Sequence, residues 1–167
     1  MEGLIVVFNT SPLIFLDRLG YLEKSLSLFQ TVIIPGKVLA EIFVKDDKIK
    51  EDINNLKNRK DVIFGLETKL IKLYKALKER LGKGEAEAIS VAIEKNADLV
   101  ILDDYAARKI AIELGLEVKG TLGILRKLAE NGEIEIQDIR ELYKRLIEIG
   151  FRIRKDIFEN IFSKFIR

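Results

Sequence analysis

Five side chains with carboxylate or carboxamide groups stand where an apolar run of the sequence gives way to a turn or a helix. They are Asn9, Glu41, Glu85, Asp103 and Asp104. Oxygen atoms of this kind are the ligands that hard cations such as Mg²⁺ prefer. In open α/β sheets, ligands bind in the crevice outside the carboxyl ends of the strands. The sequence therefore predicts an acidic metal site at one edge of a parallel sheet.

The pair Asp103-Asp104 is the strongest single indication of this metal site in the sequence. It follows the apolar run 99–102, whose lack of alternation suits a strand buried on both faces. Two adjacent carboxylates at a strand end repel each other unless a cation or an arginine neutralises them. The alternative is a helix N-cap at one aspartate with the other solvated. Arg108, one helical turn beyond, either pairs on the helix surface or reaches a phosphate.

A second polar element, Asn9-Thr10-Ser11-Pro12, follows the apolar run 4–8. Ser11 suits a helix cap and Pro12 the first helical position, so a helix N-terminus faces the strand end. Two interpretations stay open. The element is either a plain cap, or a site in which Asn9 supplies an oxygen ligand and Ser11 a hydroxyl group for a phosphate.

The glutamates of the central region are weaker indications of the metal site. Glu85 and Glu87 follow Gly82-Lys83-Gly84 in the first turn of a predicted helix. Because they are two positions apart, they point to roughly opposite sides, and at most one serves a shared site. Helical periodicity does not decide which one. Glu41 lies on a mostly apolar helix, where a carboxylate is usually solvated.

The composition limits the chemistry. The 167 residues include no cysteine and no histidine, which excludes thiol chemistry and removes the commonest general base. The 29 basic and 27 acidic residues leave a net charge of +2, so nucleic-acid binding must come from a local patch. No apolar run has the length of a membrane span and no signal sequence is evident, so we expect a cytoplasmic protein. Abundant Lys, Glu and Ile resembles the usage of thermophiles.

Strands and helices alternate over most of the chain, which predicts an α/β fold with right-handed crossovers. A chain of this length buries one core. Short apolar runs predict strands at 4–9, 32–35, 61–66, 99–102 and 116–118. Helical spacing predicts, among others, an exposed helix over 46–58 and a longer helix over 67–81.

The C-terminal tail has a different pattern, so we divide the chain into a core domain, 1–132, and a helical extension, 133–167. The extension carries two apolar stripes at helical spacing: Ile139, Leu142, Leu146 and Ile149, then Ile153, Ile157, Phe158, Ile161, Phe162 and Phe165. The second stripe holds too much apolar surface to stay exposed on a monomer. It predicts packing on the same chain, a homodimer interface or a bound protein, and we expect a homodimer.

Five segments taken together resemble a PIN domain, and their order and spacing are more specific than any one of them. They are Val6 to Ile14, Ile34 to Ile42, Gly84 to Ile89, Leu99 to Asp104 and Gly120 to Leu125. The resemblance is narrowest to a prokaryotic branch with Gly-Glu-Ala-Glu-Ala and Gly-Thr-x-Gly-Ile-Leu segments. It covers roughly residues 4 to 130 and implies an α/β/α sandwich with a central parallel sheet, followed here by C-terminal helices.

The resemblance also implies an activity. PIN domains are nucleases that depend on Mg²⁺ or Mn²⁺ and act mostly on RNA, and many are toxins of the VapC type restrained by an antitoxin protein. The acidic quartet of the family falls on Asn9, Glu41, Glu85 and Asp103, with Asp104 as a fifth metal ligand. Glu41, Glu85 and Asp103 would be catalytic. The residues expected to contact the substrate phosphate are Ser11, Lys83, Arg108 and Thr121.

One residue departs from the family pattern. The first acid of the quartet is usually aspartate, whereas this chain has Asn9. A carboxamide offers an oxygen to a hard cation but removes one negative charge, which favours the alternative of an inactive PIN scaffold that binds RNA or protein. A receiver-like signalling domain also holds Mg²⁺ with paired acids. It is disfavoured because the acid pair follows the strand at 99–102 and not the first strand.

Overall fold

The protein is described by a computed structural model that covers residues 3–45, 47–135, 137 and 139–166. Its centre is a five-stranded parallel sheet with the strand order β3-β2-β1-β4-β5. The strands are β1 (Ile5–Phe8), β2 (Thr31–Pro35), β3 (Val62–Leu66), β4 (Leu99–Ile101) and β5 (Val118–Lys119). The chain enters the sheet at β1, moves outward to β3 and then returns to β4, so the strand order reverses between β1 and β4. This is the point where ligands bind in such sheets.

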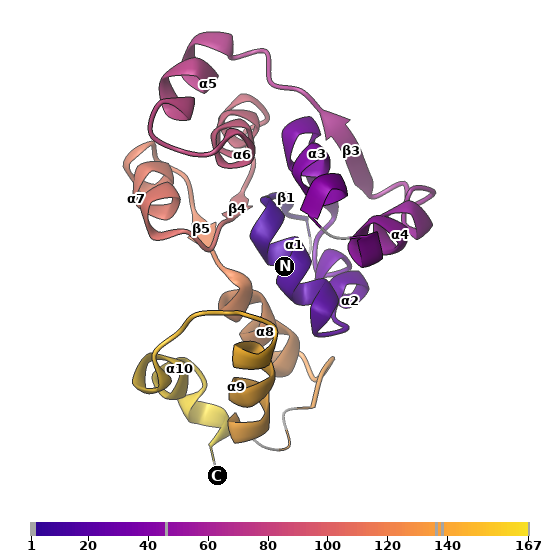
Figure 1. Ribbon diagram of the computed structural model, residues 1–167, viewed down its shortest axis with the longest axis vertical. Helices are drawn as coiled ribbons and strands as arrows, with labels where there is room; N and C mark the ends of the chain where they lie inside the picture. Colours follow the sequence, from indigo (N-terminus) through magenta and orange to yellow (C-terminus); the bar gives the residue numbers. More distant parts are fainter. Residues whose placement is uncertain (1–2, 46, 136, 138, 167) are drawn as a thin grey trace.

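Helices flank the sheet and confirm the α/β architecture (Figure 1). They are α1 (Thr10–Arg18), α2 (Leu22–Leu26), α3 (Gly36–Lys45), α4 (Asp47–Asn55), α5 (Ile71–Lys78), α6 (Lys83–Glu94), α7 (Tyr105–Glu113), α8 (Thr121–Glu130), α9 (Ile139–Glu148) and α10 (Lys155–Ile161), followed by a 3-10 turn at Ser163–Phe165. None of the described helices combines the length and the apolar character needed to cross a membrane.

Strands β1 and β4 are buried except for Ile5 at the start of β1, as their unalternating apolar runs predict. Val7 of β1 and Val100 of β4, which pair in the sheet, have no exposed surface. The edge strand β3 differs, because Val62 is buried whereas Ile63 is largely exposed. The sheet therefore holds the carboxyl ends of β1 and β4 rigidly, and the site residues follow these two ends.

Two helix predictions need correction. Residues 46–58 were expected to be exposed, but Ile49 and Ile53 of α4 are fully buried, because two apolar residues one turn apart suffice to pack one face. The helix expected over 67–81 is confined to α5. The amide of Lys69 donates to Glu94 at 2.7 Å and that of Leu70 to Thr68 at 3.1 Å, so side chains satisfy the backbone there without helical hydrogen bonds.

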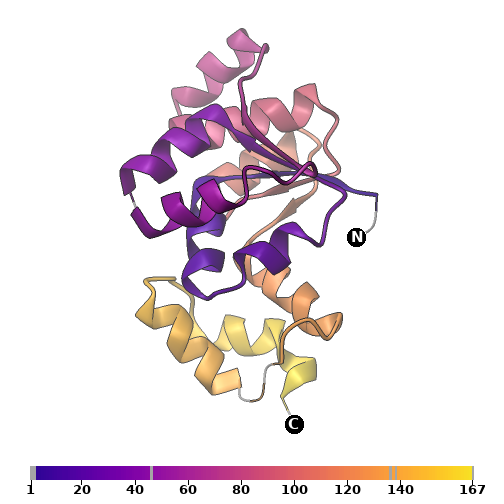
Figure 2. The same cartoon turned by 90° about the vertical axis from the view of Figure 1, so that its right-hand side faces the viewer.

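The C-terminal extension packs on the core domain of the same chain, at the end of the molecule where α8 lies (Figure 2). The rings of Phe15 in α1 and Phe151 in the extension meet edge to face, with centroids 5.0 Å apart. The Arg145 guanidinium donates to the carbonyl of Leu19 at 2.9 Å. Phe158, from the second stripe, is fully buried. Phe158 and Phe162 of the stripe are thus covered within one chain, whereas Ile157 of the same stripe is 44% exposed, and the homodimer stays a prediction.

Candidate active site

The first site residues lie side by side at the carboxyl ends of β1 and β4. Phe8 pairs with Ile101 in the sheet, and the amide of Asn9 donates to the carbonyl of Ile101 at 3.1 Å. Asp103 follows Ile101 by two residues. The chain therefore places Asn9 and Asp103 next to the reversal of strand order, as their positions after apolar runs predict.

Asn9 does not act as a side-chain cap of α1. It occupies the N-cap position of α1, yet its side chain makes no capping hydrogen bond. The residue is 3% exposed, and its Oδ1 atom is buried without a hydrogen-bond partner among the described residues. A buried acceptor without a partner costs about 1–3 kcal/mol. An oxygen held in this way fits a ligand for a hard cation.

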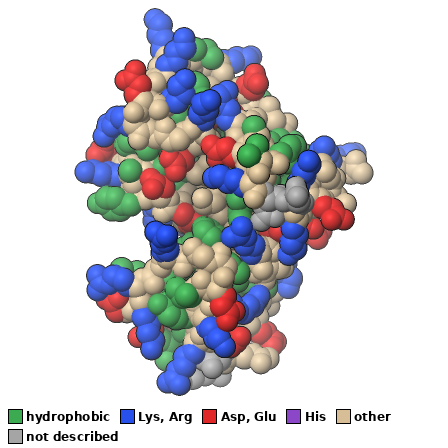
Figure 3. Space-filling view, in the orientation of Figure 1, with side chains coloured by type: hydrophobic (Ala, Val, Ile, Leu, Met, Phe, Trp, Pro, Cys, Tyr) green, Lys and Arg blue, Asp and Glu red, His purple; other side chains and the backbone are tan. Residues whose placement is uncertain are grey.

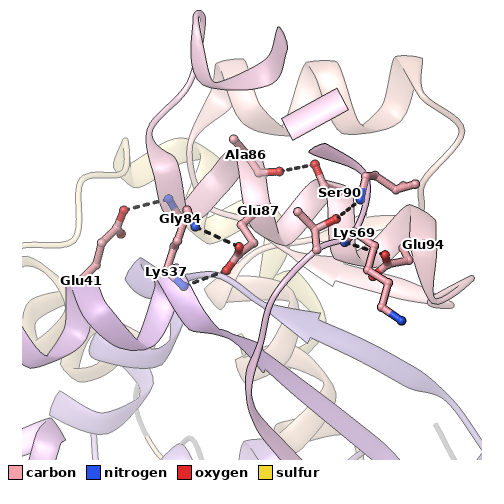
Figure 4. Close-up of polar contacts among 10 residues, drawn as sticks. Lys37, Glu41, Lys69, Gly84, Ala86, Glu87, Ser90 and Glu94 are labelled. Carbon is pink, nitrogen blue, oxygen red and sulfur yellow. Dashed lines mark hydrogen bonds and ion pairs between the residues drawn. The ribbon is translucent and has the colours of Figure 1, made fainter. Parts of the chain in front are cut away.

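The carboxylate of Glu41 is held from two sides. Thr10 Oγ1 donates to Oε2 at 2.7 Å. The Gly84 amide, in the first turn of α6, donates to Oε1 at 2.9 Å (Figure 4). A Cβ atom on Gly84 would lie 2.7–2.8 Å from the Glu41 carboxyl atoms. Glycine is therefore required for α6 to approach α3 this closely.

The role of Thr10 was missed in the sequence. The sequence instead predicted Ser11 as the hydroxyl group of the site, and Ser11 lies half-buried in the first turn of α1. Thr10 is fully inside the protein and is the residue whose hydroxyl reaches Glu41. The only signal for Thr10 in the sequence is its position directly after Asn9. Its contact with Glu41 was not predictable because the two residues are 31 positions apart in the chain.

Glu85 lies half-buried at the start of α6, where its Oε2 accepts from the Gly82 amide at 3.2 Å. Burial is the main reason that the pKa of Glu85 is raised, and the negative charges of Asp104 and Glu41 raise it further. The Gly82 hydrogen bond and the charge of Lys45 oppose the rise. Glu85 thus stands in a field of like charges that a bound cation would relieve.

Glu87 faces a different partner, which settles the ambiguity between the two glutamates of α6. It is 1% exposed, accepts from the Lys37 amide at 2.8 Å and lies 3.4 Å from Lys37 Nζ (Figure 4). These contacts tie α6 to the first turn of α3. Glu87 is a structural residue, and Glu85 is the candidate ligand on this helix.

Asp103 is oriented by the start of α8. The Thr121 amide donates to Oδ1 at 2.7 Å and the Thr121 hydroxyl to Oδ2 at 2.6 Å. A Cβ atom on Gly120 would lie 2.7 Å from Oδ1, so a second glycine allows a close approach to an acid. Burial raises the pKa of Asp103, and the two Thr121 hydrogen bonds and the charge of Arg108 oppose that rise. Any contact of Thr121 with a phosphate would compete with its bonds to Asp103.

The remaining predicted residues lie around this edge. Asp104 is the N-cap of α7 and accepts from the Ala107 amide at 2.9 Å. It is therefore the member of the Asp103-Asp104 pair that caps a helix, which is one of the two alternatives that the sequence left open. Lys83 is exposed at the start of α6. The side chains of Arg108 and Asp103 both lie against Gly120, because a Cβ atom added to this glycine would be within 3 Å of each of them. These positions are compatible with phosphate binding.

The acids do not form a tight cluster. Among the described residues, no three Asp or Glu side chains lie close enough together to hold a metal ion directly. Mg²⁺ usually keeps several waters and takes only one or two carboxylates. The donor set of carboxylate and amide oxygens therefore fits a hydrated hard cation, with some of the acids binding through water.

Comparison with known proteins gives one informative result. No curated protein matches the sequence. A family model described as PIN domain matches residues 5–167, which include the sheet, the acidic edge and the C-terminal extension. The chain belongs to the PIN domain family.

Proposed function

We propose that the protein is a ribonuclease that uses Mg²⁺ or Mn²⁺ to hydrolyse phosphodiester bonds of RNA. The PIN domain is a nuclease-type fold, which supports the reaction class. The observation that carries the proposal is the buried Oδ1 atom of Asn9, which has no described partner and lies at the same sheet edge as Glu41 and Asp103. An amide oxygen left in this state beside acids suits a cation better than any bond within the chain.

The residues that would hold the ion are Asn9, Glu41, Glu85, Asp103 and Asp104, in part through water. When bound, such an ion activates water and stabilises the oxygen that leaves the phosphate. Thr10 and Gly84 orient Glu41, and Thr121 orients Asp103. Glu41, Glu85 and Asp103 are the proposed catalytic residues. Ser11, Lys83 and Arg108 would bind the phosphate.

An assay with labelled single-stranded RNA tests the proposal. Cleavage is expected in Mn²⁺ or Mg²⁺ and not in EDTA, and Asp103→Asn should reduce it at least about a hundredfold, because the variant leaves two carboxamides in the quartet. Asp156→Asn makes the same change at an exposed position of α10 and should cleave like the wild type. Cleavage that persists in EDTA would count against the proposal.

A second candidate function is a PIN scaffold that binds RNA or protein without cleaving. Asn9 favours it, because one charge of the quartet is missing. RNA binding with no cleavage in either cation would select it. The VapC-type toxin role, an antitoxin partner, the homodimer and a cytoplasmic location are further parts of our proposal, which pull-down with a neighbouring gene product and light scattering would test.

A further inference from the structure

A cleft of about 610 Å³ lies between the core domain and the C-terminal extension. One wall comes from α7, β5 and the length of α8, and the other from the segment before α10 and from α10 itself. Figure 3 shows the molecule hollowed at this place, below α7, with basic side chains around the hollow. Asp103 lines the cleft, so it opens directly on the acidic edge of the sheet.

The cleft concentrates positive charge. Its basic residues are Arg108, Lys119, Arg126, Lys127 and Arg152, and its acidic ones are Asp103 and Glu130. Glu130 is already paired with Arg126 at 3.0 Å and with Lys164 at 2.6 Å. Because the whole chain carries a net charge of only +2, this excess is local. A local basic groove is what binding to a phosphate backbone requires.

The extension holds one of these charges in a fixed place. Phe151 packs on Phe15, and Arg18 Nη1 donates to the Ile149 carbonyl at 3.0 Å, so the segment that precedes Arg152 is tied to α1. Arg152 itself is exposed, lines the cleft and forms no ion pair with a described residue. Its charge is therefore presented to the cleft and is not used to hold the extension in place.

The groove continues on the other side of Arg108. A second cleft, of about 440 Å³, shares Asp103 and Arg108 with the first and is lined by Tyr105. Tyr105 is 80% exposed. Exposed aromatic rings beside a basic groove stack on the bases of single-stranded nucleic acids. The two clefts adjoin at Asp103 and Arg108, so a path through both would pass Asp103, with cations on one side and an aromatic ring on the other.

We propose that the C-terminal extension is part of the substrate site and that an unpaired RNA strand follows this path. Its phosphates contact Arg152, Arg126 and Lys119, and a base beyond Asp103 stacks on Tyr105. The volume of about 610 Å³ lies in the range of pockets that bury a single small ligand, which suits a stretch of single strand and is too small to enclose a duplex. Stacking also needs a base with a free face. The inference rests on the proposed function for its choice of RNA.

Salt titration of RNA binding tests the extension's part. The full-length protein is mixed with a short fluorescein-labelled oligouridylate in EDTA, where metal-dependent cleavage does not occur, and anisotropy is measured over a series of salt concentrations. Arg152→Gln should lower the slope of log K against log[salt] by about 0.7, the value for one lost phosphate contact with a single strand. Arg152→Lys keeps the charge and should keep the slope. Lys72→Gln, on exposed α5, is the matched control.

Two further measurements test the unpaired strand. Tyr105→Ala should weaken binding about tenfold or more, whereas Tyr105→Phe keeps the ring and should bind like the wild type. The duplex formed with the complementary strand should bind more weakly than the single strand, and Tyr105→Ala should leave duplex binding unchanged.

The outcomes separate this inference from the proposed function. If Arg152→Gln keeps the wild-type slope, or if Tyr105→Ala binds normally, the path is wrong and the cleft is left for a protein partner. Cleavage of RNA in Mn²⁺ together with such results would leave the ribonuclease proposal standing. The expected binding results without cleavage in any cation would uphold the path and contradict the ribonuclease.

Discussion

At the scale of single residues, the site depends on which side chains are already occupied. Glu41 and Asp103 each have both carboxylate oxygens bonded by neighbours in the chain. Asn9 Oδ1 has no described partner. The acids are therefore pre-oriented by the protein, and Asn9 is the group that most needs an external ligand. Substitutions at Asn9 and at the two acids are therefore expected to have different effects on metal binding.

Restoring the missing charge should strengthen metal binding. Asn9→Asp places a carboxylate where the buried amide oxygen now stands, and we expect Mn²⁺ affinity to rise on the order of tenfold or more, since a unit charge about 4 Å from a cation contributes a few kcal/mol in a protein interior. Calorimetric titration measures it. Asn131→Asp, at the end of α8, is the control. Equal or weaker affinity in the Asn9 variant would show that the amide is not a ligand.

The raised pKa of Asp103 predicts a pH dependence with a definite sign. Because burial makes the folded protein bind this proton more tightly than the unfolded chain, the carboxyl group favours folding at low pH. This advantage is lost as pH rises from the ordinary value of 3.8 through the raised pKa. In EDTA, the stability of the wild type relative to Asp103→Asn should therefore fall over that window.

Mn²⁺ should reverse this trend, because ionised Asp103 then has a cation to bind. Thermal unfolding of both proteins between about pH 3.5 and pH 7, with EDTA and with Mn²⁺, gives the comparison. A difference that rises with pH in EDTA would mean that Thr121 and Arg108 outweigh burial at this carboxyl group.

At the scale of elements, the sequence indicated the strands well and the contacts between helices poorly. Unalternating apolar runs marked β1 and β4, and with them the positions of Asn9 and Asp103. Helical periodicity did not decide between Glu85 and Glu87, because the choice depends on α6 packing against the first turn of α3, where Lys37 lies 50 residues from Glu87. Only the family resemblance pointed to Glu85. The non-helical segment before α5 was not predictable either, because it depends on a hydrogen bond from the Lys69 amide to Glu94, which is distant in the sequence.

The close approach of α6 to α3 predicts an unusual effect of one alanine. Gly84→Ala adds a better helix former, worth up to about 1 kcal/mol, but its Cβ atom would displace the carboxylate of Glu41. We expect a melting temperature near that of the wild type together with a loss of at least about tenfold in Mn²⁺ affinity and in cleavage.

Gly123→Ala provides the matched control for this variant. It makes the same change within α8, where the added Cβ atom meets only ordinary contacts with Lys119. Metal affinity should stay at the wild-type value. If both variants bind Mn²⁺ normally, Glu41 either moves without consequence or is not a ligand.

At the scale of the whole molecule, the extension completes the core domain. The amphipathic pattern of the tail predicted two helices, and the structure contains both. The surface that they cover was not predictable, because apolar stripes do not specify their partner. The segment between the two helices packs on α1 of the same chain, where Phe151 meets Phe15, and Arg145 of α9 donates to the Leu19 carbonyl at the end of α1. Lys164, in the turn after α10, pairs with Glu130 of α8.

A chain that ends at Gly132 tests this arrangement. Truncation removes the cover from Phe15 and exposes apolar surface of α1, so we expect the shortened protein to aggregate or unfold. Light scattering and circular dichroism of the full and the shortened chain measure it. If the full chain is a dimer and the shortened chain a folded monomer, the extension instead serves mainly as a subunit interface. Because Arg152 is lost with the extension, a shortened chain that folds should also bind single-stranded RNA with a smaller salt slope than the full protein.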